Sequence, residues 1–283
     1  CQSLEILSLD GTKITGAGFD NLLKLPNLKM LSFGAYQNGA PVDDDGMKFL
    51  CQMRQITSLS LNGTKVTDAG MEHISKLENL ENLSLDFTEV TSEGLKFLVG
   101  MKNLKSLRFQ KSGAKLDLDD DAAKYLSQVP SLERVIGKWK LSEAGFQHLA
   151  KLKKLTSLDF KDIVSDKDLS HIAMMTSLEN LGFHRCPITD GGIAKLVDLE
   201  NLKNLSLWRT DVTGKSLEAI QRLPNLKHLA IEFKEFGPVS NWKWLGKMTS
   251  LTSLSIDDKE FDKLAFTAIA KLKNPLNKGR CVD

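Results

Sequence analysis

His184 and Cys186 stand two residues apart, and residues of these types can act as a general base and a nucleophile. The histidine would take the proton of the thiol, because the thiolate is the species that attacks. No third residue is placed to orient His184, so we expect no catalytic site and no enzyme. The four cysteines, at positions 1, 51, 186 and 281, include no Cys-x-x-Cys pair, so neither a zinc site nor a disulfide framework is indicated.

Two clusters of aspartates could supply carboxylate ligands to a metal ion. Clustered carboxylates suit Ca²⁺, but the spacing of an EF-hand loop is absent. Aspartates also favour the N-terminus of a helix, where N–H groups are unpaired and the helix dipole is positive. Helix capping is the simpler interpretation, so we expect neither a metal nor another cofactor. The weak metal candidates are Asp43, Asp44, Asp45, Asp119, Asp120 and Asp121.

Aromatic and charged residues recur as neighbouring pairs between residues 138 and 233. Tryptophan and arginine are among the types most enriched in the hot spots of protein interfaces, and two of the four tryptophans lie in these pairs. Nearer the N-terminus the corresponding positions hold small or acidic residues, such as Asp10, Gly34 and Asn62. The candidate partner-binding residues are Lys138, Trp139, His184, Arg185, Trp208, Arg209, Glu232 and Phe233.

The composition narrows the class of partner. Of 283 residues, 41% are hydrophobic and 26% are charged, which is ordinary for a globular protein with a core. The 38 basic and 36 acidic residues leave a net charge of +2, and carboxylates at Asp159, Asp162 and Glu232 interrupt the basic residues. A groove that follows phosphates would not intersperse carboxylates, and no apolar run reaches the roughly 18 residues of a membrane helix. We therefore expect neither nucleic-acid binding nor membrane insertion.

The elements that must position these residues come from an internal repeat. Leucine, two residues, leucine, one residue and leucine recur at intervals of 23 to 28 residues. Two further columns, 18 and 21 residues into each repeat, contain no polar residue, and Leu98 and Leu149 belong to the first of them. The repeats start at Leu4, Leu28, Ile56, Leu80, Leu104, Leu132, Leu155, Leu178, Leu202, Leu226 and Leu251.

Each repeat has two halves with different periods. In residues 80–90 leucines alternate with polar residues, which predicts a short strand with one apolar face. In residues 92–103 the spacing of Leu95, Leu98 and Met101 predicts a helix of about three turns with one apolar stripe. One repeat cannot bury both apolar faces alone, so the repeats are expected to stack.

The stretch ITSLSLNGTKVTDAGM, residues 56–71, resembles a leucine-rich repeat. It is most similar to the 24-residue type common in bacterial repeat proteins, which is related to the arms of F-box-type proteins and of ribonuclease inhibitor. The resemblance covers about residues 1–276 and implies an α/β solenoid, a horseshoe of about eleven repeats, with a parallel inner sheet and outer helices. The family places Asn or Cys at a buried ladder position, where this sequence has Thr64 and Cys186 but departs at Lys140 and Lys234.

The resemblance also implies where a partner binds. In such a solenoid the polar strand positions face the concave side, so the paired aromatic and charged residues would lie there. Strands six to ten would span roughly 19 Å, which suits a protein loop or an extended peptide. Because arginine binds carboxylates in two-pronged fashion, an acidic partner is slightly preferred.

The chain ends bear on the extent of the domain. We expect residues 1–283 to form a single domain, in which residues 273–283 could serve as a C-terminal cap. Cys1 occupies the buried column three residues before Leu4, so the repeat is already under way at the first residue. A trimmed piece of a larger protein is the other interpretation.

Three functions remain open at this stage. The expected one is a non-catalytic scaffold that binds a protein or peptide on its concave face. The alternative is the substrate-receptor arm of a larger multidomain protein, for example one like a ubiquitin ligase or a bacterial effector. An enzyme is least favoured, because the sequence contains no Gly-rich phosphate loop, nucleophile elbow or metal-ligand pair.

Overall fold

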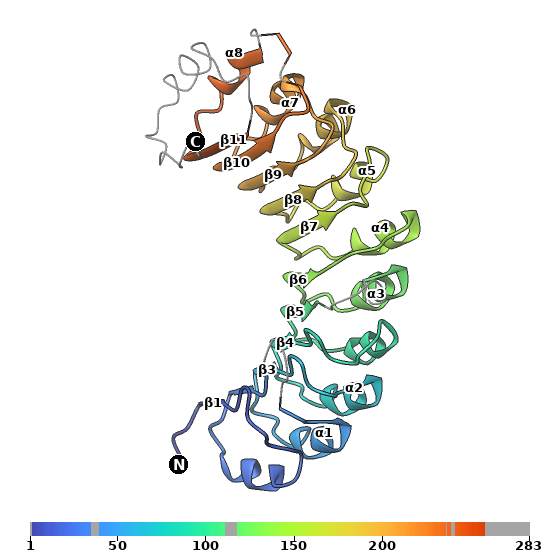
Figure 1. Ribbon diagram of the computed structural model, residues 1–283, viewed down its shortest axis with the longest axis vertical. Helices are drawn as coiled ribbons and strands as arrows, with labels where there is room; N and C mark the ends of the chain where they lie inside the picture. Colours follow the sequence, from blue (N-terminus) through green and yellow to red (C-terminus); the bar gives the residue numbers. More distant parts are fainter. Residues whose placement is uncertain (1, 35–39, 111–117, 236, 239–240, 258–283) are drawn as a thin grey trace. The chain divides into compact units, whose positions relative to one another are not determined.

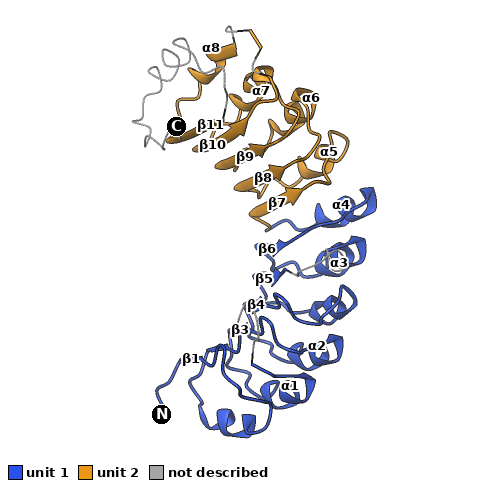
Figure 2. Cartoon of the chain, in the orientation of Figure 1, with its two compact units in different colours: residues 1–154 blue, residues 155–283 orange. Residues whose placement is uncertain are grey.

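The structure is a computed structural model that describes residues 2–34, 40–110, 118–235, 237–238 and 241–257. Contacts between residues divide the chain into two compact units, Cys1–Lys154 and Leu155–Asp283, which Figure 2 colours separately. Each unit is described by itself below. The expected cap at residues 273–283 lies outside the described residues.

Each unit has parallel strands along one side and helices along the other (Figure 1). In both units each strand pairs with the strand of the next repeat, and equivalent leucines align, as Leu31 does with Leu59. In the first unit the strands are β1 (Ile6–Ser8), β2 (Met30–Ser32), β3 (Ser58–Ser60), β4 (Asn82–Ser84), β5 (Ser106–Phe109) and β6 (Arg134–Gly137). In the second unit they are β7 (Ser157–Lys161), β8 (Asn180–His184), β9 (Asn204–Trp208), β10 (His228–Glu232) and β11 (Ser253–Asp257).

The helices are shorter than the sequence predicts. The expected three turns are wrong, because the longest of the described helices have seven residues, which is about two turns. A longer helix would not leave enough chain to return to the next strand within one repeat. The first unit has η1 (Phe19–Lys24), α1 (Asp44–Leu50), α2 (Asp68–Ile74), η2 (Glu93–Leu98), α3 (Asp120–Leu126) and α4 (Glu143–Leu149). The second has α5 (Leu169–Ile172), α6 (Asp190–Ile193), η3 (Ala194–Leu196), η4 (Gly214–Ser216), α7 (Leu217–Ile220) and α8 (Trp242–Leu245).

The core lies between the strands and the helices of each unit. Most leucines of the strand phrase are buried there, and Leu98 and Leu149 of the helix column are fully buried. The exceptions are half-buried and lie in the first and last repeats, at Leu4, Leu7, Leu9 and Leu254. Phe160 and Phe183, which occupy the same repeat position on adjacent strands, stack with ring centroids 5.9 Å apart. Stacking therefore continues one core through successive repeats, as the polar-free columns predict.

Hydrogen bonds between a Thr or Ser at a helix N-terminus and an Asp of the preceding repeat join several neighbouring repeats. Thr67 accepts a hydrogen bond from Ala69 N as the N-cap of α2, and its own N–H and hydroxyl donate to Asp44 of the preceding repeat at 2.9 and 2.6 Å. Asp68 in turn accepts from Thr91, so the chain of bonds continues. A Cβ at Gly70 would overlap the Asp44 carboxylate. Glycine leaves room for this carboxylate, and a Cβ at Gly94, Gly145 or Gly192 would overlap the aspartate of its preceding repeat in the same way.

Candidate functional site

Three candidate residues lie side by side at the ends of strands in the second unit. His184 of β8 aligns with Trp208 of β9, and Glu232 ends β10. The side chain of His184 is exposed, whereas Trp208 and Glu232 are half-buried. Neighbouring parallel strands are about 4.8 Å apart, so one extended ligand can touch all three side chains.

The next residue adopts a left-handed backbone in several repeats. Gly11 and Gly63 have φ values of 65° and 70° there, and Arg185 and Arg209 have values of 53° and 52°. The leucine periodicity does not reveal this demand, because it contains no information on backbone angles. A side chain in this conformation costs roughly 1–2 kcal/mol. The two arginines therefore stand where glycine would suit the backbone better.

The two arginines differ in their partners. Arg185 forms a two-pronged ion pair with Asp162, with Nε–Oδ1 at 2.7 Å and Nη2–Oδ2 at 3.0 Å. The hydrogen bond and the charge of Asp162 raise the pKa of Arg185 above its usual value. Arg209 makes no side-chain hydrogen bond or ion pair with another residue in the part of the chain that the structure describes. The guanidinium of Arg209 can therefore meet a partner.

Two of the predicted binding residues are buried, and their assignment to the exposed surface is wrong. Trp139 is 1% exposed and Phe233 is 8% exposed. Lys140 donates its N–H to Leu118 O as Lys65 does to Val42 O, so Trp139 occupies the ladder position of Thr64.

The same register shift explains Phe233. Lys234 donates its N–H to Val212 O, which again places the preceding residue in the buried ladder. Counting forward from the first leucine misplaced both rings by one residue. The departures from the Asn or Cys of the family pattern therefore lie at Trp139 and Phe233, which fill the ladder position, and not at Lys140 and Lys234 as expected.

Lys138 is exposed, but it belongs to the first unit. The candidate surface is therefore restricted to the second unit. We call it the strand-end patch and define it as His184, Arg185, Trp208, Arg209 and Glu232.

The aspartate clusters serve the helix ends. Asp43 accepts from Gly46 N at 3.3 Å, and Asp119 accepts from Ala122 N at 2.9 Å, each as an N-cap. Asp120 accepts from Ser142 as Asp44 does from Thr67. Lys48 lies 2.6 Å from Asp45 and lowers the pKa of that carboxyl through their hydrogen bond. Asp121 lies in the first turn of α3. Among the described residues, no group of three His, Cys, Asp or Glu side chains could hold a metal ion.

The thiol next to His184 faces the core. Cys186 is 1% exposed, and burial raises the pKa of its thiol above the usual value. Its Sγ lies 3.5 Å from the carbonyl oxygen of His184, whose side chain is exposed. A buried, protonated thiol is a poor nucleophile, so the structure does not build the pair that the spacing suggested.

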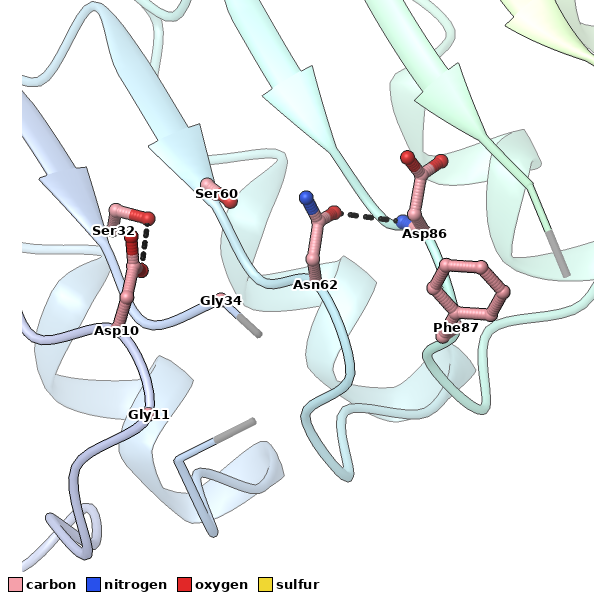
Figure 3. Close-up of a pocket in the computed structure, with 8 residues that line it drawn as sticks. All are labelled: Asp10, Gly11, Ser32, Gly34, Ser60, Asn62, Asp86 and Phe87. Atoms are coloured by element: carbon pink, nitrogen blue, oxygen red, sulfur yellow. Dashed lines mark hydrogen bonds between the residues drawn. The ribbon is translucent and has the colours of Figure 1, made fainter. Parts of the chain in front are cut away.

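A hollow lies at the strand ends of the first unit, where the sequence has mostly small or polar residues. It has a volume of about 400 Å³, and Figure 3 shows its lining. The types of these residues can be read from the sequence, but the space that they line depends on how consecutive repeats stack. The lining residues are Asp10, Gly11, Ser32, Gly34, Ser60, Asn62, Asp86 and Phe87.

No protein-family model matches this sequence, and no curated protein sequence matches it significantly. No helix among the described residues is long and apolar enough to cross a membrane.

Several solved structures do share the fold. An internalin, InlF, from Listeria monocytogenes superposes with a TM-score of 0.58 at 20% identity, over 96% of this chain and 86% of that one. A leucine-rich repeat protein from Leptospira interrogans gives 0.55 at 19% identity, over 96% and 70%. The ectodomain of the Arabidopsis receptor kinase HAESA, in complex with an IDA peptide hormone, gives 0.57 at 17% identity, over 84% of this chain and 39% of that one. These identities speak for the fold alone, and with the repeat and the parallel strands they show that this chain has the fold of a leucine-rich repeat solenoid.

Proposed function

We propose that this protein is a non-catalytic scaffold that binds a protein or peptide through the strand-end patch. The observation that carries the proposal is the pair Trp208 and Arg209. A half-buried tryptophan stands beside an exposed arginine that has no ion-pair partner among the described residues, and the arginine is held in a backbone conformation that favours glycine. Tryptophan and arginine are the residues that most often dominate binding energy.

The charges favour an acidic group over one part of the patch. Arg185 and Asp162 neutralise each other, which leaves Arg209 and the exposed Lys161 as cations. Glu232 and Asp257, aligned on β10 and β11, are acidic. We therefore expect a carboxylate of the partner near Arg209, an apolar side chain against Trp208, and no acidic residue over β10 and β11.

The fold is consistent with this proposal. HAESA, which shares it, holds a peptide ligand in its structure. That likeness does not extend to the residues of the patch, so the proposal depends on the patch itself.

Selection from a displayed random peptide library would test the proposal without a known partner. Wild-type protein should enrich peptides that combine an acidic residue with an apolar one. The double variant Trp208→Ala, Arg209→Ala should lose these peptides, with affinity falling about thirtyfold or more. A matched control is Trp244→Ala, Arg222→Ala, which removes the same residue types from the helix side of the same unit.

Two results would contradict the proposal. One is a set of peptides that binds the double variant as tightly as the wild type. The other is equal loss in the control, which would indicate a change in folding instead of a lost contact.

A further inference from the structure

The hollow in the first unit is built from the strand ends of four consecutive repeats. Ser32 and Ser60 come from β2 and β3, and Asn62 follows β3 by two residues (Figure 3). A Cβ at Gly34 would lie 3.0 Å from Ser60 Oγ and 3.1 Å from Asn62 Cβ. Any side chain at Gly34 would therefore fill the space. The volume of about 400 Å³ is within the range of small-molecule sites.

Some polar groups of the hollow are already engaged. Asn62 Oδ1 accepts from Ser84 Oγ at 2.6 Å and from Asp86 N at 2.9 Å. The Asp86 carboxylate accepts from Gln110 N at 2.7 Å and pairs with Arg108 Nη2 at 2.9 Å. The buried charge of Asp86 is thereby neutralised.

Other polar groups are open. The amide N–H groups of Asn62 and the hydroxyl of Ser60 make no hydrogen bond within the described ranges. Asp10 Oδ1 accepts from the Ser32 hydroxyl, while Oδ2 has no described partner. The hollow thus offers donors from an amide, an acceptor from a carboxylate, and a hydroxyl that can do both.

We propose that this hollow binds a polyhydroxylated ligand such as a sugar ring. Hydroxyl groups both donate and accept, so they can satisfy the Asn62 amide and the Asp10 carboxylate together. A cation could use only the acceptors and would face the amide N–H groups of Asn62. An anion would be repelled by Asp10.

The ring of Phe87 adds an apolar wall to the hollow. Its φ of 61° is at the same repeat position as Gly11 and Gly63, where the backbone itself favours glycine. A phenylalanine there can contact the C–H face of a sugar, which hydrogen bonds leave uncovered.

The test is a titration of the whole chain, followed by NMR at the Asn62 side-chain amide and the Gly34 backbone amide. The probes are methyl α-D-glucoside, methyl α-D-mannoside and N-acetylglucosamine, with agmatine as a cationic probe. At least one sugar should shift both signals with a Kd on the order of millimolar, as expected for a small ligand with few contacts. Agmatine should shift neither signal.

Two variants sharpen the result. Ser60→Ala removes a hydroxyl and should weaken sugar binding about threefold to tenfold. Asn62→Asp keeps the oxygen that Ser84 and the Asp86 N–H need but replaces the donors, so it should abolish sugar binding and admit agmatine. Ser255→Ala, at the same repeat position on β11, should bind sugar like the wild type.

The proposal is overturned if agmatine binds the wild type in place of the sugars, or if no probe shifts the signals. It also fails if Ser255→Ala weakens binding as much as Ser60→Ala. Sugar binding should persist in Trp208→Ala, so this test is independent of the proposed peptide-binding function.

Discussion

The strand ends of the first unit and those of the second use one backbone in two ways. At the left-handed position after the strand, Gly11 and Phe87 line a hollow in the first unit, whereas Arg185 and Arg209 carry long cationic side chains there in the second. The strands and their leucine registers are alike in both units. The difference teaches that the repeat sets the frame, and that the side chains at the strand ends decide between a hollow and a protruding contact surface.

The largest expected effect separates two tryptophans that the sequence treats alike. Trp139→Ala should lower the free energy of unfolding by about 3–5 kcal/mol, because it empties a buried ladder position. Trp208→Ala should lower it by less than about 1 kcal/mol, since that ring is half-buried at the surface. Urea denaturation of both variants measures this contrast, and equal losses would undo the register assignment.

Substitutions in the polar-free helix column should destabilise the fold in both units. Leu149→Ala and Leu98→Ala should each cost about 2–5 kcal/mol of unfolding free energy, since both leucines are fully buried. Thermal or urea denaturation provides the measurement. A loss below about 0.5 kcal/mol at both positions would contradict the stacking of the helices.

Peptide binding should be sensitive to substitutions in the strand-end patch and insensitive to substitutions in the hollow. Trp208→Ala should weaken a selected peptide about thirtyfold, which corresponds to about 2 kcal/mol, while Asn62→Asp should leave the peptide's Kd unchanged. Isothermal titration with one peptide and both variants measures this. A common loss would mean that the two strand-end regions do not act separately.

Salt should reveal the charge component of the patch. Raising the ionic strength should slow association of an acidic peptide, because exposed charges are screened, and should leave the Trp208 contribution intact. Stopped-flow or surface-based kinetics at two salt concentrations measure the association rate. A salt-independent rate would argue against an acidic partner.

The smallest expected effect concerns the turn position itself. Arg209→Gly should be about 1 kcal/mol more stable than Arg209→Ala, because both remove the side chain but only glycine accepts a φ near 52° without strain. Both variants should weaken peptide binding equally. Equal stability of the two variants would show that the left-handed backbone imposes no strain there.

Most of the frame could be predicted from the sequence. The leucine phrase placed the strands, and the polar-free columns placed the core. These features are local and periodic, and stacking makes every repeat obey the same pattern. The helix length was overestimated, because an apolar spacing does not show where the chain must turn back.

The exposed surface was predicted less well, for a physical reason. Tryptophan at 139 and tryptophan at 208 have the same distance from a repeat start to within one residue, yet one is buried and the other is half-exposed. A one-residue difference within a turn is resolved only by which N–H meets which carbonyl, as between Lys140 and Leu118. The sequence by itself thus determined the repeat, the strands, the approximate places of the helices and the core. The tertiary structure alone decided which rings face solvent, which arginine keeps its charge available and where a hollow opens, because these depend on contacts between neighbouring repeats.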